Sequence, residues 1–332
     1  MNTSYMVVVA VTLCFIALTV SAVCFARKRI RVPVSQNIPR SFFWGKYAAN
    51  KIYYVGGDAS VAAHELIGAD VNTFQVLDYL YAKDKNRIYY KHRAIEVDPT
   101  SFYVENGVPK DAHSVYFLEI DKDEKPLLRV IAGADPHTYQ RMTERPGWGK
   151  DHQHYFFRHQ QLNVGYESFA FISDVWAKDK ERVYQLTNTG VVPVDLDVNT
   201  LSVLNEHYLR DYRQVLYAGI IPGSDDQIHQ LNIVPIQADE PVALLSEYHL
   251  CYQNEIYYCG VETDIDAASF QPFLIAGRLF HGFSKDKHYV YKFNRKIKHI
   301  DVASFRLVGD ILRDKHNRYD ADGDIFGSPF QG

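Results

Sequence analysis

The chain has 332 residues, of which 47% are hydrophobic and 23% charged, and its formal net charge at pH 7 is −4. This composition excludes intrinsic disorder as the main state, and a single apolar run long enough to cross a bilayer excludes a multi-pass membrane protein. The mild acidity argues against a nucleic-acid partner bound through its phosphates. With 24 tyrosines and 19 phenylalanines, the composition favours β structure, because aromatic residues are enriched in strands.

An uncharged run rich in Val, Ala, Leu and Phe occupies residues 5–26. A helix of this length rises about 33 Å, which suffices to cross the hydrocarbon core of a bilayer. No Lys or Arg precedes the run, and it is longer than the apolar part of a cleaved signal peptide. The sequence therefore predicts a retained single-span transmembrane helix in contact with the lipid bilayer.

Four cations between residues 27 and 31 follow this run, and only the α-amino group lies before it. The positive-inside rule then predicts an inner (cytoplasmic) membrane protein whose C-terminal domain is cytoplasmic, with a periplasmic domain as the alternative. Beyond residue 33, 32 cations face 40 acids, so the soluble part carries a charge of −8. We expect an anchor with its basic flank over 1–32, a linker over 33–45, a repeat array over 46–326 and a tail over 327–332.

A short motif recurs after the linker, which is the signature of a repeat architecture. Its clearest copy is Tyr-Ala-Lys-Asp-Lys-Asn-Arg-Ile-Tyr-Tyr at residues 81–90, with near copies at 176–184 and 283–291. The leading tyrosines of successive copies lie 27 to 40 residues apart. About eight repeats and a truncated ninth therefore fill the soluble region as one continuous array.

A second element, Asp-x-x-(Ser/Thr) followed by an aromatic residue or Leu, follows each motif at a variable distance, and another copy precedes the clearest motif at residues 70–74. Its Asp is suited to accept backbone hydrogen bonds in a polar turn, and its last side chain is suited to the core. Phe102, Phe270 and Phe305 hold this last position in three copies.

Each motif predicts a β-hairpin closed by a tight turn. At residues 84–87 the Asp can cap the turn, and Asn tolerates the left-handed conformation. The flanking segments are rich in aromatic and branched residues, and 94–97 supplies a third strand. We therefore expect an all-β fold of tandem hairpins after the transmembrane helix, as an open or curved array or an irregular propeller-like one. Three strands per repeat slightly favour the open form over four-stranded blades.

The recurrence of the motif resembles the DKNYY family of bacterial envelope-associated proteins, named for an Asp-Lys-Asn-x-Tyr-Tyr hairpin. The resemblance covers roughly residues 45–320, and its clearest copy is Asp84-Lys-Asn-Arg-Ile-Tyr-Tyr90. It implies no catalytic motif. It does imply an accessory or immunity protein of the kind found beside toxin-delivery genes, in a non-cytoplasmic location that conflicts with the charge pattern of the anchor.

The motif residues invite a catalytic interpretation, since they include Asp and Lys pairs. One active site does not need several copies, however, so we expect turn and core roles for them. The tyrosines likewise suit packing between repeats more than an exposed platform for glycans. The residues expected to build the repeats are Asp84, Lys85, Asn86, Tyr89, Tyr90, Asp179, Lys180, Tyr184, Asp286, Lys287, Tyr291, Phe102, Phe270 and Phe305.

Two other clusters of potential ligands occur, and neither predicts a metal site. His152 and His154 could share one side of a strand, but Zn²⁺ needs three or four ligands and this segment is expected to be a turn. Residues 320–324 have Asp at alternating positions around a Gly, but the Glu that completes a calcium loop is missing. We expect no cofactor, no metal and no catalytic residue.

Cys251 and Cys259 are the cysteines of the soluble region. A hairpin over residues 250–258 would place Cys251 opposite Ile256, so we expect two reduced thiols and no disulfide.

These observations predict a membrane-anchored binding protein and not an enzyme. The expected partner is another protein, with neutralisation of a cognate bacterial toxin as the most specific form. The alternative is a module that binds an envelope glycan or a small ligand through a stripe of tyrosines.

Overall fold

The computed structural model describes residues 31–33, 43–47, 51–55, 64–223, 230–238 and 240–326. The transmembrane helix predicted over residues 5–26 lies outside these ranges, as do the tail and most of the linker. Within the described ranges, no helix is long and apolar enough to cross a membrane. The chain divides into an N-terminal body, residues 1–162, and a C-terminal body, residues 163–332.

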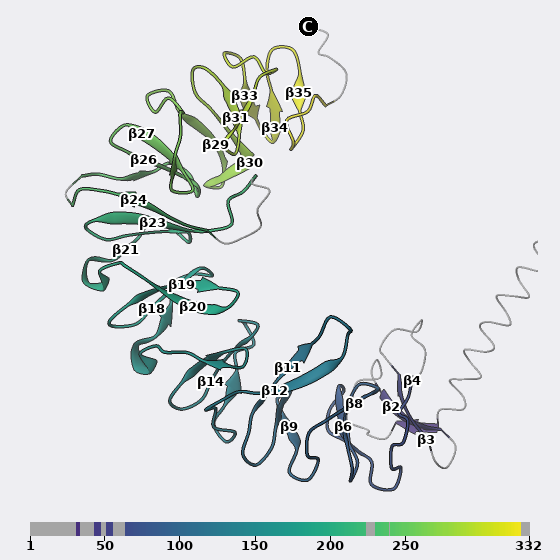
Figure 1. The fold of residues 1–332 in the computed structure, drawn as a ribbon. Helices are drawn as coiled ribbons and strands as arrows, with labels where there is room; N and C mark the ends of the chain where they lie inside the picture. Colours follow the sequence, from purple (N-terminus) through teal and green to yellow (C-terminus); the bar gives the residue numbers. More distant parts are fainter. Residues whose placement is uncertain are drawn as a thin grey trace, which may run out of the picture. The chain divides into compact units, whose positions relative to one another are not determined.

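Both bodies are built of small antiparallel β-sheets, which confirms the prediction of an all-β fold of hairpins (Figure 1). The strands of the N-terminal body are β1 (Arg31–Pro33), β2 (Phe43–Tyr47), β3 (Lys51–Val55), β4 (His64–Glu65), β5 (Gln75–Val76), β6 (Tyr81–Lys83), β7 (Ile88–Tyr90), β8 (Arg93–Ile95), β9 (Tyr103–Glu105), β10 (Val108–Lys110), β11 (Tyr116–Ile120), β12 (Pro126–Val130), β13 (Gln140–Arg141), β14 (Trp148–Lys150), β15 (Tyr155–Phe157) and β16 (Gln160–Gln161).

The C-terminal body continues the same plan and adds two 3₁₀ turns, η1 (Tyr166–Ser168) and η2 (Val198–Thr200). Its strands are β17 (Ala170–Phe171), β18 (Trp176–Lys178), β19 (Val183–Thr187), β20 (Gly190–Val194), β21 (Ser202–Val203), β22 (Tyr208–Arg210), β23 (Gln214–Gly219), β24 (Gln230–Pro235), β25 (Ala243–Leu244), β26 (His249–Tyr252), β27 (Glu255–Tyr258), β28 (Val261–Glu262), β29 (Gln271–Ile275), β30 (Arg278–Lys285), β31 (Val290–Lys292), β32 (Arg295–Ile297), β33 (Arg306–Val308), β34 (Ile311–Arg313) and β35 (Arg318–Tyr319).

Most sheets have four strands, so the expectation of three strands per repeat was wrong. The additional strand consists of the residues after each second element, two or three of them in every case except β29, which has five. Strand β5, for example, follows residues 70–74 and pairs with β6. Strands this short leave no alternating pattern in the sequence. The count of four removes the strand-based preference for an open array over blades.

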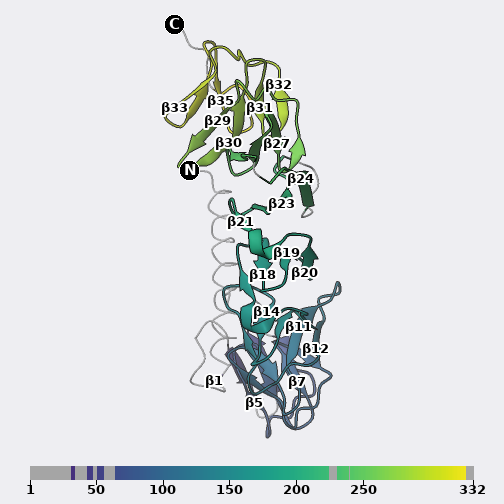
Figure 2. The ribbon, with the colours of Figure 1, turned by 90° about the vertical axis from the view of Figure 1, so that its left-hand side faces the viewer.

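The two faces of a hairpin pack against the preceding and the following sheet. In the β5–β8 sheet, Tyr89 packs with Ile52 on one side, and Ile88 packs with Phe102 and Tyr116 on the other. The β29–β32 and β33–β35 sheets stack in the same way in the C-terminal body (Figure 2). Each repeat therefore completes the core of its neighbours, as expected for repeats that bury no sufficient core alone.

The third repeat departs from this plan, because β10 and β11 pair only through one bridge, Lys110 to Val115. In the β6–β7 hairpin, Ala82 pairs with Tyr89 across the sheet. Pro109 occupies the position of Ala82, two residues before the turn Asp, and has no N–H to donate to the opposite strand. The two strands therefore separate beyond the bridge and leave two-stranded sheets, β9–β10 and β11–β12.

Candidate functional site

The carboxylate of Asp84 organises the turn of the clearest repeat. Its Oδ1 accepts the backbone N–H groups of Asn86 at 2.7 Å and Arg87 at 2.8 Å. Its Oδ2 accepts the backbone N–H of Asp70 at 2.9 Å and the hydroxyl of Tyr89 at 2.8 Å. With four donors around a side chain that is 3% exposed, this Asp joins two segments of the chain.

The same set of contacts recurs at the other two strong motifs. Tyr184 donates its hydroxyl to Asp179 and Tyr291 donates its hydroxyl to Asp286, each at 2.7 Å. All three tyrosines are buried, at 1–2% exposure, so they do not form a surface stripe. The structure thus places these aspartates in turns and these tyrosines in the core.

Electrostatics favour the ionised form of the turn carboxylates. Burial alone would raise the pKa of Asp179, but the hydrogen bonds it accepts from Gly165, Tyr184, Glu181 and Arg182 lower it to about 2. The pKa of Tyr184 rises, because the ring is buried and its hydroxyl donates to a carboxylate. The pair is therefore a fixed anion and a fixed donor, which does not suit acid–base catalysis near neutral pH.

The lysine after the turn Asp contacts the second element that precedes it in the chain. Lys85 Nζ lies 2.9 Å from the Asp70 carboxylate, and Lys287 Nζ lies 2.7 Å from that of Asp266. Lys180 has no such partner, since Gly165 replaces the Asp in its second element, and its ammonium lies 3.8 Å from Glu181 instead. These pairs are exposed, so each contributes little stability.

The lysine before the turn Asp contacts the second element that follows it. Lys83 Nζ donates to the carbonyl oxygens of Pro99 at 3.1 Å and Phe102 at 2.6 Å. Lys285 repeats this arrangement with Val302 and Phe305. These two hairpins are thus attached to the second elements on both sides. This role of the lysines was not predicted from the sequence, although their recurrence before the Asp is visible there.

The remaining motif residues have plainer roles. Phe102 and Phe305 are buried, and Phe270 is half-buried against His249, with ring centroids 4.8 Å apart. Tyr90 is half-buried beside Tyr81. Asn86 is exposed, and its backbone does not adopt the left-handed conformation anticipated for it. The left-handed residue of this sheet is Lys91, with φ of 53°, in the turn between β7 and β8.

The histidine and aspartate clusters form turns. His152 Nδ1 lies 2.9 Å from Thr138 Oγ1, and His154 Nδ1 lies 3.7 Å from Asp151. Asp320 accepts the backbone N–H groups of Asp322 and Asp324. Among the described residues, no three metal-binding side chains converge.

The register predicted for the cysteine hairpin is confirmed, since Cys251 pairs with Ile256. Both thiols are free; Cys259 is buried and Cys251 half-buried. Burial raises the pKa of Cys259 to about 12, so this thiol is unreactive in the folded protein.

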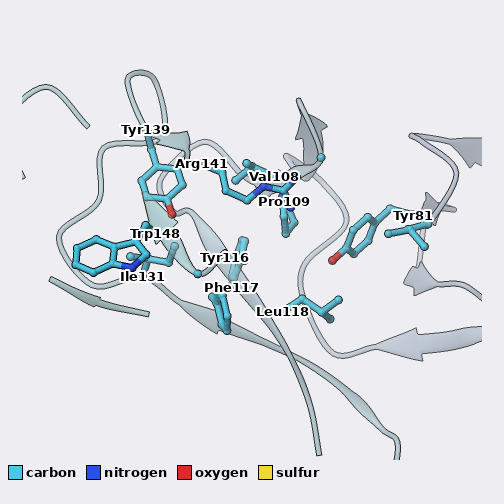
Figure 3. Close-up of a pocket in the computed structure, with 13 residues that line it drawn as sticks. Tyr81, Val108, Pro109, Tyr116, Phe117, Leu118, Ile131, Tyr139, Arg141 and Trp148 are labelled. Carbon is cyan, nitrogen blue, oxygen red and sulfur yellow. The ribbon is translucent and has the colours of Figure 1, made fainter. Parts of the chain in front are cut away.

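A pocket opens where the third repeat separates, and the sequence analysis did not predict it. The cavity measures about 220 Å³, and its lining comes from the β5–β8 sheet, the separated strands and the β13–β16 sheet (Figure 3). Tyr81, Tyr116, Leu118 and Trp148 supply aromatic and aliphatic walls, and Arg141 supplies a cation. Pockets that bind small molecules combine an apolar lining with a few polar groups in this way.

The comparisons with known proteins agree with the repeat pattern. The model of the DKNYY family matches residues 46–220 and again residues 176–323. No curated protein and no solved structure matches the chain. Together the two matches span the described repeats of both bodies, and the chain therefore belongs to the DKNYY family.

Proposed function

We propose that this chain is a non-catalytic binding protein whose partner is another protein. The charged and phenolic residues that recur in the repeats are used inside the array, as the contacts of Asp84, Asp179 and Asp286 illustrate. What the array offers to a partner is the outer edges of its sheets.

The observation that carries this proposal is the fourth strand of successive sheets in the C-terminal body. Strands β20, β24 and β28 each end a sheet, so each has one edge to which no strand of the described residues is hydrogen-bonded. Val192, Ile233 and Val261 on these strands are 43%, 54% and 47% exposed. A strand with open backbone groups and branched apolar side chains is a template for pairing with another chain.

In its most specific form the proposal makes the partner a bacterial toxin, with this chain as its immunity protein. A charge of −8 beyond residue 33 would speed encounter with a basic partner. We further propose that residues 5–26 attach the protein to the inner membrane, with the repeat array in the cytoplasm by the charge rule.

The test is an affinity pull-down with the full-length protein, tagged at the C-terminus, from lysates of the native cell. We expect one stoichiometric protein, lost in the variant Ile233→Lys. Ile67→Lys is the matched control, because Ile67 is 83% exposed in the N-terminal body. Equal recovery with both variants would refute docking at these strands, and recovery of cell-wall fragments alone would favour glycan binding.

A further inference from the structure

The third repeat differs from the others at several positions that meet in one place, the pocket of Figure 3. Two of them lie on β10. Val108 stands where other hairpins have an aromatic residue, among them Tyr81, Trp148, Trp176, Tyr208 and Phe283. The smaller side chain leaves volume unfilled, and Pro109 beside it prevents the strands from closing over that volume.

Two more departures lie in the second element and in the strand that follows it, β13. Tyr139 occupies the position that Phe102 and Phe305 hold in other copies, and so adds a hydroxyl. Arg141, two residues later, stands where the corresponding residues of other copies are apolar, among them Val76, Val104, Val203 and Leu307. The two departures on β10 weaken the packing, and these two departures add polar groups to the cavity that results.

The position of Tyr139 is fixed from two sides. Lys110, 1% exposed, donates to its backbone carbonyl at 3.0 Å. A Cβ on Gly149 would lie 2.1 Å from the Tyr139 hydroxyl oxygen, so only Gly leaves room for it there. The corresponding residues in other hairpins are Ala82, Ala177 and Ser284.

Three donors in this pocket have no acceptor. The hydroxyls of Tyr81 and Tyr139 turn toward its interior, and Arg141 runs along its upper side (Figure 3). Among the described residues, none of these groups has a hydrogen-bond partner, although Tyr81 is only 2% and Tyr139 only 5% exposed. Burial raises the pKa of both phenols, so both remain protonated donors.

We propose that this pocket binds a monoanionic ligand, a carboxylate attached to a small apolar or aromatic group. The guanidinium of Arg141 pairs with the carboxylate, for which its planar geometry is suited, and the Tyr139 hydroxyl, on the same side of the pocket in Figure 3, donates to it. The apolar group lies against Tyr116, Leu118 and Trp148. One cation balances one negative charge, which favours a carboxylate over a doubly charged phosphate.

The volume sets the size of the apolar group. A cavity of about 150 Å³ holds a benzene molecule, so 220 Å³ accommodates one ring with a short acidic chain. Such a group occurs in a free aryl carboxylate and at the C-terminus of a peptide that ends in Phe. The proposal does not depend on the protein partner proposed above.

The experiment is calorimetric titration of the full-length protein with 3-phenylpropionate, with its uncharged amide, and with a short peptide ending in Phe as the free acid or as the amide. We expect the acids to bind and the amides to bind at least tenfold more weakly, because each amide lacks the charge that pairs with Arg141. Binding of 3-phenylpropionate indicates a free small acid, and binding of the peptide acid alone indicates a chain terminus.

Variants connect the binding to the pocket. Arg141→Gln, at an exposed side chain, is expected to weaken binding about tenfold or more, and Tyr139→Phe severalfold. Arg182→Gln, an exposed arginine in the C-terminal body, is the matched control. Val108→Tyr restores the aromatic residue of the other repeats and is expected to abolish binding. No binding of either acid, or equal binding by the wild type and Arg141→Gln, would overturn the proposal.

Discussion

Replacing Tyr184 by Phe tests whether the turn carboxylate joins the repeats as described. The ring stays in place against Phe169, with centroids 6.1 Å apart, and only the hydroxyl that donates to Asp179 at 2.7 Å is lost. Asp179 keeps three backbone donors, from Gly165, Glu181 and Arg182. The change therefore removes one buried hydrogen bond to an ionised group and little else.

A hydrogen bond to a charged group contributes about 1.5–3 kcal/mol. Because the carboxylate remains solvated by its three other donors, we expect the lower part of that range, about 1.5–2 kcal/mol. For a body the size of residues 163–332 this corresponds to a fall in melting temperature of about 3–8 °C.

The assay is urea unfolding followed by tryptophan fluorescence, with Trp176 of the same hairpin as a buried reporter. Tyr212→Phe is the matched control, since Tyr212 is 46% exposed and its loss of a hydroxyl should cost less than about 0.5 kcal/mol. A loss of stability in Tyr184→Phe no larger than in the control would refute the role assigned to the carboxylate.

Four further outcomes are expected. The pKa of Asp179 falls from 3.8 to about 2 on folding. The ionised carboxylate therefore stabilises the folded protein above pH 3.8, and this stabilisation is lost as the pH drops toward 2. Urea midpoints measured from about pH 5 to 2 should decline less in Asp179→Asn than in the wild type. Pro109→Ala supplies the missing N–H, so hydrogen exchange should show a newly protected amide there, with little net change in stability because the unfolded chain also gains freedom. A thiol reagent should modify Cys251 in the native protein but Cys259 only after unfolding, as their burial differs. The full-length protein should remain in membranes after a carbonate wash, whereas a chain lacking residues 1–32 should not.

The sequence predicted the features that lie close together in the chain. The turn at residues 84–87, the register that pairs Cys251 with Ile256 and the burial of Phe102 all follow from local patterns. The number of strands did not follow, because a two-residue strand such as β5 carries no periodicity.

Contacts between distant elements were also beyond a local pattern. The backbone of Asp70 donates to a carboxylate 14 residues later, and that of Asp266 to one 20 residues later, so no fixed spacing indicates the partner. The pocket could be predicted only by comparing the repeats with one another, position by position. Pro109 and Arg141 become informative only when each is set beside the residue at the same position of the other repeats.

Hairpins such as β6–β7 and β30–β31 are attached both to the second element before them and to the one after. The natural block of this array therefore begins at one second element and ends just before the next. In a segment such as residues 70–97, the backbone N–H of Asp70 donates to the turn carboxylate of the same segment, and Lys83 donates to the second element that follows. Duplication or loss of such a block keeps these contacts between second elements and hairpins. A cut between a second element and its hairpin would instead remove two of them, such as the hydrogen bond from Asp70 to Asp84 and the ion pair of Lys85 with Asp70. Strand length inside a block is free to vary, as the extended β29–β30 hairpin shows. The array can therefore gain or lose repeats, or specialise a single one, without redesign of the rest.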